Sequence, residues 1–208
     1  MLNLLTKQMP STVDVGGISV PINTSFRTWI DIWTVVDNPK ALDWKKAAVI
    51  LLKAFPYEPQ SDGSVPYQIA VAHTEEALTA ALDFLQRKSI HGPEKPPTKQ
   101  QRRLKKVRLF DWRYDAVRVI SDFEREYHID LTDPKTDMHW WRFMSLFDGL
   151  SDTSQTMEAI RIRAVDLDDK NLNKQMRASY RERQQALMLP ARTREEAAHN
   201  RHIRGMDG

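Results

Sequence analysis

The sequence predicts a mainly α-helical protein: a helical bundle with a short N-terminal β-hairpin and a basic, mobile linker between two helical blocks. Over most of the chain, apolar residues recur every three or four positions, which is typical of helices packed on one face. One stretch near the N-terminus instead alternates apolar and polar residues, and one central stretch has no apolar period. We therefore expect a hairpin and helical block over 1–90, a linker over 91–109, a helical block over 110–190 and an arginine-rich tail over 191–208.

The hairpin is expected over residues 12–22. Apolar and polar residues alternate there on both sides of Gly16-Gly17. Glycine reaches the positive φ angles of the tight turns that match strand twist, so this pair is a hairpin signal. Pro21 has no amide to donate, so we expect its strand to lie at an edge or to end there.

Two helices are expected to follow and to pair as an antiparallel hairpin. Ser25 can cap the first, which is broken at 37–39, and Asp43 can cap the second, which ends at Pro56. Their apolar positions are Phe26, Trp29, Ile30, Trp33 and Val36 in the first, and Trp44, Ala47, Ala48, Leu51, Leu52 and Phe55 in the second. After a loop over 56–66, one long or two short helices continue to about Lys88.

The linker carries the strongest local charge of the chain. Seven lysines and arginines and no acid occur between residues 95 and 108, so the rest of the chain is net acidic. Basic side chains neutralise phosphates, which makes Arg102, Arg103, Lys105 and Lys106 the candidate nucleic-acid residues. Because no aromatic residue for base stacking is interleaved with them, the linker interpretation is favoured over nucleic-acid binding.

The second block contains the most apolar and aromatic stretch, residues 133–150. Asp137 can cap a helix there, and Gly149 can end it with a positive φ. A helix opening with Asp111-Trp112 should precede it. Further helices should begin after Ser151 or Asp152 and run from Leu172 to Leu187. We expect Pro190 to end the ordered region, and the tail to be a weak helix from Thr193 or disordered.

Most of the six tryptophans lie at helical core spacing, so we expect them to pack inside. Adjacent residues on a helix point about 100° apart, so Trp140 and Trp141 cannot easily face one neighbour. The spare ring is a candidate for binding a partner, because large amphipathic side chains concentrate binding energy. The full candidate set is Trp140, Trp141, Phe143, Trp112, Trp29 and Arg27.

Nothing in the sequence predicts an enzyme. Gly-rich phosphate loops, nucleophile elbows and cysteines are absent, so we expect no catalytic residue, metal or cofactor. His128, Asp130, Asp137 and His139 are donors that a metal could use, but their spacing favours structural roles. No apolar run approaches the roughly 20 residues that cross a bilayer, and the first residues lack a secretory pattern. A soluble, cytoplasmic protein is expected.

Four short motifs together resemble the bacteriophage family called gene product fifteen. They are residues 21–29, 110–112, 127–131 and 139–143, in an order that matches the family over about 10–190. The resemblance implies a tail-assembly chaperone of long-tailed phages and prophages, which has no catalytic residues, binds the tape-measure protein and helps to recruit tail-tube subunits. It would work in the cytoplasm of the bacterial host and be absent from the mature virion.

Such a chaperone needs one surface for its client and another for the next copy of itself. Self-association through a head-to-tail contact that does not close would give an open oligomer or spiral. Two alternatives remain at this point: a phage nucleic-acid-binding protein that uses the basic linker, and a structural tail or head-completion protein.

Overall fold

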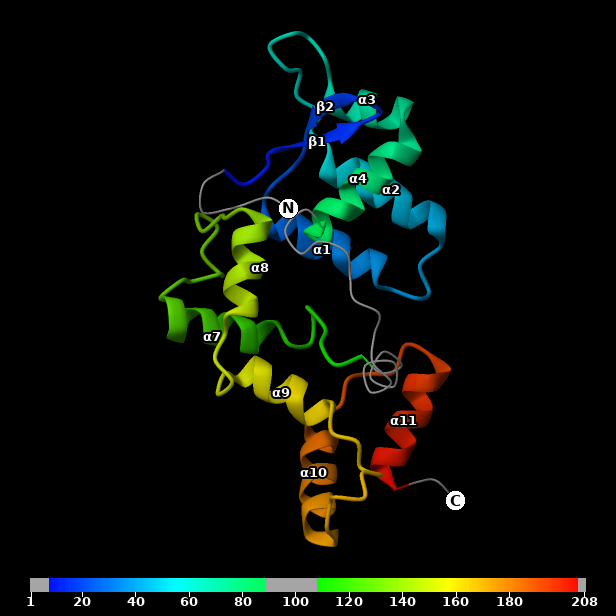
Figure 1. Ribbon diagram of the computed structural model, residues 1–208, viewed down its shortest axis with the longest axis vertical. Coiled ribbons are helices and arrows are strands. Elements are labelled where there is room, and N and C mark those ends of the chain that lie inside the picture. Colours follow the sequence, from blue (N-terminus) through cyan, green and yellow to red (C-terminus); the bar gives the residue numbers. More distant parts are fainter. Residues whose placement is uncertain (1–7, 89–107, 206–208) are drawn as a thin grey trace. The chain divides into compact units, whose positions relative to one another are not determined.

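The computed structural model describes residues 8–88 and 108–205 and is mainly α-helical with one antiparallel β-hairpin, which confirms the predicted fold class (Figure 1). The chain forms two compact units. The described part of unit 1 is 8–88 with 137–148, and that of unit 2 is 108–136 with 149–205. The expected block at 110–190 is therefore divided, because its Trp-Trp helix folds with the N-terminal elements.

The hairpin of unit 1 forms where it is predicted. Strands β1 (Thr12–Val15) and β2 (Ile18–Pro21) pair in antiparallel register, with Val15 opposite Ile18. Gly16 and Gly17 make the turn with φ of 61° and 83°, angles that side chains larger than glycine rarely adopt. Pro21 is the last residue of its strand, as expected.

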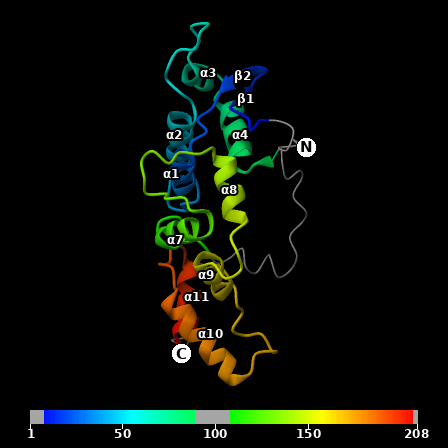
Figure 2. The same ribbon diagram turned by 90° about the vertical axis from the view of Figure 1, so that its left-hand side faces the viewer.

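Four helices of unit 1 follow the hairpin: α1 (Phe26–Val36), α2 (Asp43–Ala54), α3 (Pro66–Ala72) and α4 (Thr74–Leu85). α2 packs against both α1 and α4, and β1 lies against α4 (Figure 2). After the loop over 56–66 the chain forms two short helices, α3 and α4, and not one long helix. The break falls at His73, whose ψ of 55° is outside the helical range.

Helix α8 (Trp140–Asp148) joins unit 1 through backbone pairing. An isolated antiparallel bridge pairs Ser25 with His139, and the Trp140 amide donates to the Thr24 carbonyl at 2.7 Å. The expected caps Ser25 and Asp137 bond to each other instead, because the Ser25 Oγ donates to Asp137 Oδ1 at 2.8 Å. Ser25 therefore stands at the N-cap position of α1 without capping it through its side chain, and the predicted cap at Asp137 is wrong.

The two ends of α8 differ from the prediction for local reasons. The His139 Nδ1 accepts from the Trp141 amide at 3.1 Å, which is the role of a capping side chain. Helix α8 therefore begins at Trp140, three residues after Asp137. Gly149 does not have the positive φ expected of it.

Unit 2 contains α7 (Ala116–Tyr127), α9 (Gln155–Arg163), α10 (Lys174–Ala186) and α11 (Arg194–Arg204). Ser154, not Ser151 or Asp152, caps α9 by accepting from the Met157 amide. Thr193 caps α11 and Gly205 ends it with φ 70°. Order therefore continues past Pro190, and the helical alternative for the tail is the one the chain adopts.

A buried ionic cluster holds unit 2 together. Arg163 donates to both carboxylate oxygens of Asp115 at 2.8 and 2.9 Å, and also to the carbonyls of Leu109 and Leu187. Arg108 pairs with Asp111 and lies 3.7 Å from Glu196. Arg108, the last cation of the expected linker, is thus part of the fold.

Candidate functional site

The tryptophan pair of α8 lies in the core of unit 1. Trp140 is 0% and Trp141 2% exposed. Their indole Nε1 groups donate to two successive carbonyls at the end of α4, Leu85 O at 3.0 Å and Phe84 O at 2.9 Å. Two adjacent indole rings can both be buried here, because their two acceptor carbonyls also belong to adjacent residues. The expectation that one ring remains exposed for a partner is therefore wrong.

Two further partner candidates also lie in this core. Phe143 stacks on Phe26 at a centroid distance of 4.7 Å, and Trp29 donates to the Asn23 carbonyl at 2.6 Å. Neither ring is exposed to solvent. Arg27 is exposed, with its guanidinium 4.9 Å from the Phe26 ring centroid.

Of the remaining candidate binding residues, one lies in unit 2 and the others lie outside the described residues. Trp112 is half-buried in unit 2 and meets Phe110 edge-on at 4.7 Å. Arg102, Arg103, Lys105 and Lys106 lie outside the described residues.

The two histidines that could have served as metal ligands have structural roles. His128 ends α7 in the left-handed conformation with φ 55°. His139 bonds the Pro10 carbonyl through Nε2 at 2.9 Å, and burial lowers its pKa, partly opposed by that bond. Within 8–88 and 108–205, no group of three or more His, Asp or Glu side chains is placed to hold a metal ion. Over the same ranges, no helix has the length and apolar character that a membrane span requires.

An exposed apolar face lies on α2. Trp44 is 69% exposed, and Leu42 and Leu52 are also exposed. The core side of α2 instead runs through Ile50 and Ala54. Of the predicted stripe from Trp44 to Phe55, Phe55 is buried but Trp44 and Leu52 are exposed, so the stripe is only in part the packing face of this helix.

A second candidate surface is an open groove of about 270 Å³ in unit 2, between α7, α9 and α10. Its apolar lining is Ala159, Ile162, Ala186 and Leu187, and its charged residues are Arg118, Glu158 and Arg183. Arg118 pairs with Asp115 at 2.9 Å, and Arg183 with Glu158 at 2.5 Å. The groove therefore combines an apolar floor with a rim whose charges are already paired.

Two exposed apolar residues lie at and just before the start of α7, the helix that contributes Arg118 to this groove. Val117, the chain neighbour of Arg118, is 77% exposed, and Tyr114 one turn earlier is 50% exposed. Val117 lies away from the packing face of α7. The buried face instead runs through Val119 and Phe123.

These features define a two-unit helical protein with exposed apolar side chains on α2 and at the start of α7. Residues 5–189 match the family described as Bacteriophage Gp15 protein. Because the match covers most of the 208 residues, the chain belongs to this family and is a phage protein. No curated protein and no solved structure matches it.

Proposed function

We propose that this phage protein is a tail-assembly chaperone, without enzymatic activity, that binds the tape-measure protein and helps to recruit tail-tube subunits. The observation that carries the proposal is the apolar groove of unit 2. Membership of the phage family supports a phage role, and the resemblance of the sequence motifs suggests tail assembly as that role. The chaperone would act in the host cytoplasm and be absent from the finished virion.

The groove suits the apolar stripe of an amphipathic client helix. Such a helix presents apolar residues at positions i, i+3, i+4 and i+7, and a groove between helices accepts them. Ala159 and Ala186 are small, so a client side chain can approach the floor between Ile162 and Leu187. Val117 and Tyr114 add exposed apolar surface that a longer client helix could cover.

The charges around the groove predict how binding depends on salt. Arg118 and Arg183 are each paired within the chain, so the groove offers few unpaired charges to a client. Apolar burial would then provide most of the affinity. Salt screens exposed charges but does not weaken apolar contacts, so the complex should persist at high salt.

The test is co-expression with the tape-measure protein of the same phage, followed by pull-down at low and high salt with nuclease present. Ala186→Glu places a carboxylate in the groove. It should weaken client capture at least tenfold, since a charge in an apolar interface costs more than about 1.4 kcal/mol. Ala178→Glu is the matched control, because Ala178 is an exposed alanine of the same helix outside the groove.

Three results would overturn the proposal. The first is a complex that survives Ala186→Glu unchanged, and the second is no complex at all. The third is recovery of this chain from purified virions, which would indicate a structural tail or head-completion protein. Nucleic acid that co-purifies in place of the client would instead favour the basic residues 102–106 as a binding segment.

A further inference from the structure

Trp44 is the exception among the tryptophans. All six lie in the described residues, and the other five are buried or half-buried. Trp44 stands on α2 between Asp43 and Lys45, both exposed, and α2 carries three lysines against this one acid. No ion pair joins Lys45 to another described residue, so Trp44 is an apolar knob on a helix whose charges sum to a net positive value.

A hollow of opposite character lies between β1 and α4. It is open and has a volume of about 620 Å³. Its lining is Asp14, Gly16, Glu75, Glu76, Thr79, Ala80 and Asp83. The uncharged residues are all small, which leaves room for a bulky side chain from outside, and four carboxylates surround them.

The acids of this hollow are largely uncompensated. Glu75 and Glu76 are exposed in the first turn of α4, and neither forms an ion pair with another described residue. Asp83 pairs with Lys88, and Asp14 accepts from the Gly17 amide at 3.2 Å. The hollow therefore remains net negative, which favours a partner surface that carries lysine.

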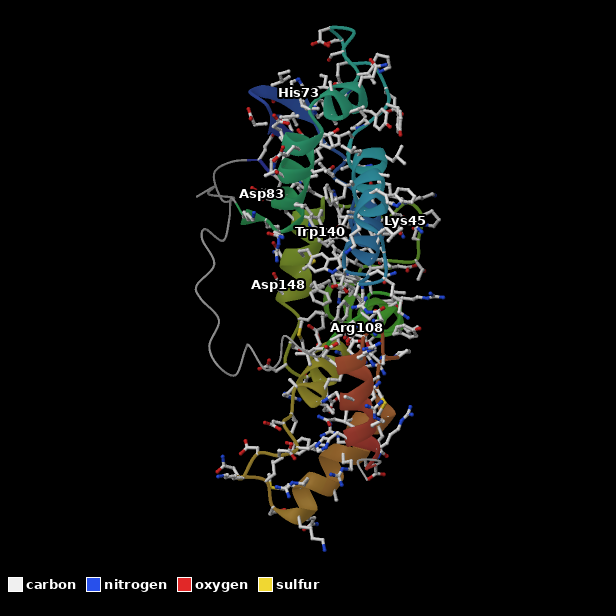
Figure 3. The ribbon with its side chains drawn as sticks, turned by 90° about the vertical axis from the view of Figure 1, so that its right-hand side faces the viewer. Lys45, His73, Asp83, Arg108, Trp140 and Asp148 are labelled. Atoms are coloured by element: carbon white, nitrogen blue, oxygen red, sulfur yellow. The ribbon has the colours of Figure 1, made fainter. Side chains whose placement is uncertain are left out.

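The two faces cannot meet within one chain. Figure 3 shows Lys45 and Asp83 on opposite sides of unit 1, with Trp140 of the core between them. Complementary faces on opposite sides of one folded unit can pair only between copies. Because the two faces are different, the contact is heterologous and leaves one face free at each end.

We infer that unit 1 associates head to tail with a second copy of this chain, with Trp44 of one copy seated in the acidic hollow of the next. Lys45 then meets the carboxylates of Glu75 and Glu76. The inference rests on the proposed function for its biological role, since a chaperone of a long client would act as many linked copies. Its physical basis is independent of any client.

The test uses the full chain alone, by size-exclusion with light scattering over a range of concentrations. Trp44→Ser with Lys45→Ser disables the knob, and Glu75→Lys with Glu76→Lys disables the hollow. The wild type should form oligomers whose mass grows with concentration and falls with salt. Each variant alone should be monomeric, with association weakened at least tenfold.

Mixing the two variants is the decisive measurement. Each retains one of the two complementary faces, so an equimolar mixture should form a dimer and nothing larger. Glu58→Lys, a charge reversal at an exposed loop residue of unit 1, is the control and should associate like the wild type. All substituted residues are exposed, so far-UV circular dichroism should be unchanged.

A wild type that stays monomeric would overturn the inference. So would a variant that associates normally, or a mixture that stays monomeric. These results do not depend on the Ala186→Glu pull-down, because no client is present. Failure of the self-association contact and failure of the client groove are therefore distinguishable.

Discussion

Replacing Trp140 or Trp141 by phenylalanine tests whether the pair is core or partner surface. Each change keeps an aromatic ring but removes one indole donor to the end of α4. Losing a buried hydrogen bond costs about 1 kcal/mol. The smaller ring forfeits roughly another 1 kcal/mol of burial. We therefore expect each variant to lose about 2 kcal/mol of unfolding free energy.

The assay is urea unfolding followed by far-UV circular dichroism, at low protein concentration and high salt to suppress self-association. Trp44→Phe is the matched control and should stay within about 0.5 kcal/mol of the wild type, because its ring is exposed. Amide exchange at the end of α4 should also accelerate in both core variants. Unchanged stability with lost tape-measure binding would refute the core assignment and restore the pair as a binding surface.

Three further predictions concern charge and local stability. Arg163→Met removes the buried partner of Asp115, leaves only the partly exposed Arg118 to pair with that carboxylate, and frees the Leu109 and Leu187 carbonyls, so it should cost about 3–5 kcal/mol in urea unfolding. Arg118→Met should cost under about 1 kcal/mol, because Arg118 is partly exposed and Arg163 still pairs with Asp115. Burial lowers the pKa of His139 in the folded chain below its ordinary value of 6.5. The stability that the neutral ring contributes is therefore fully present above pH 6.5 and is lost as the pH falls through the lower folded pKa. The melting temperature should drop on acidification, and the drop should be smaller in His139→Gln. Helix α11 buries only Glu196 and Ile203, so its amides should exchange faster than those of α8, and equal protection would contradict this.

The sequence predicted most elements of this fold because their signals are local. The Gly16-Gly17 turn needs only the backbone freedom of glycine, and the periods of α1, α2 and α7 lie within single helices. Even the tail helix was recognisable from Thr193, which caps it through its own side chain. Such signals depend only on residues a few positions apart, so they can be recognised in a single sequence.

The failures occurred where a distant residue competed for the same group. Ser25 had the sequence context of a helix cap, but its hydroxyl donates to Asp137, 112 positions later. That bond also deprives α8 of its expected cap, and His139 takes the role. The same contacts draw α8 into unit 1, away from its neighbours in sequence. A single sequence does not show which distant residue will form the hydrogen bond with a given side chain.

The candidate surfaces were missed for a related reason, because periodicity identifies an apolar stripe but not the side of the helix that packs. On α2, Trp44 and Leu51 define one apolar side, and Ile50 and Ala54 define another roughly a quarter turn away. Packing against α1 and α4 uses the second side and leaves Trp44 in water. A helix whose apolar arc is wider than its intramolecular contact retains surface that another protein can bury. For this reason we propose the exposed Trp44, in place of the buried pair, as the tryptophan that contacts a partner.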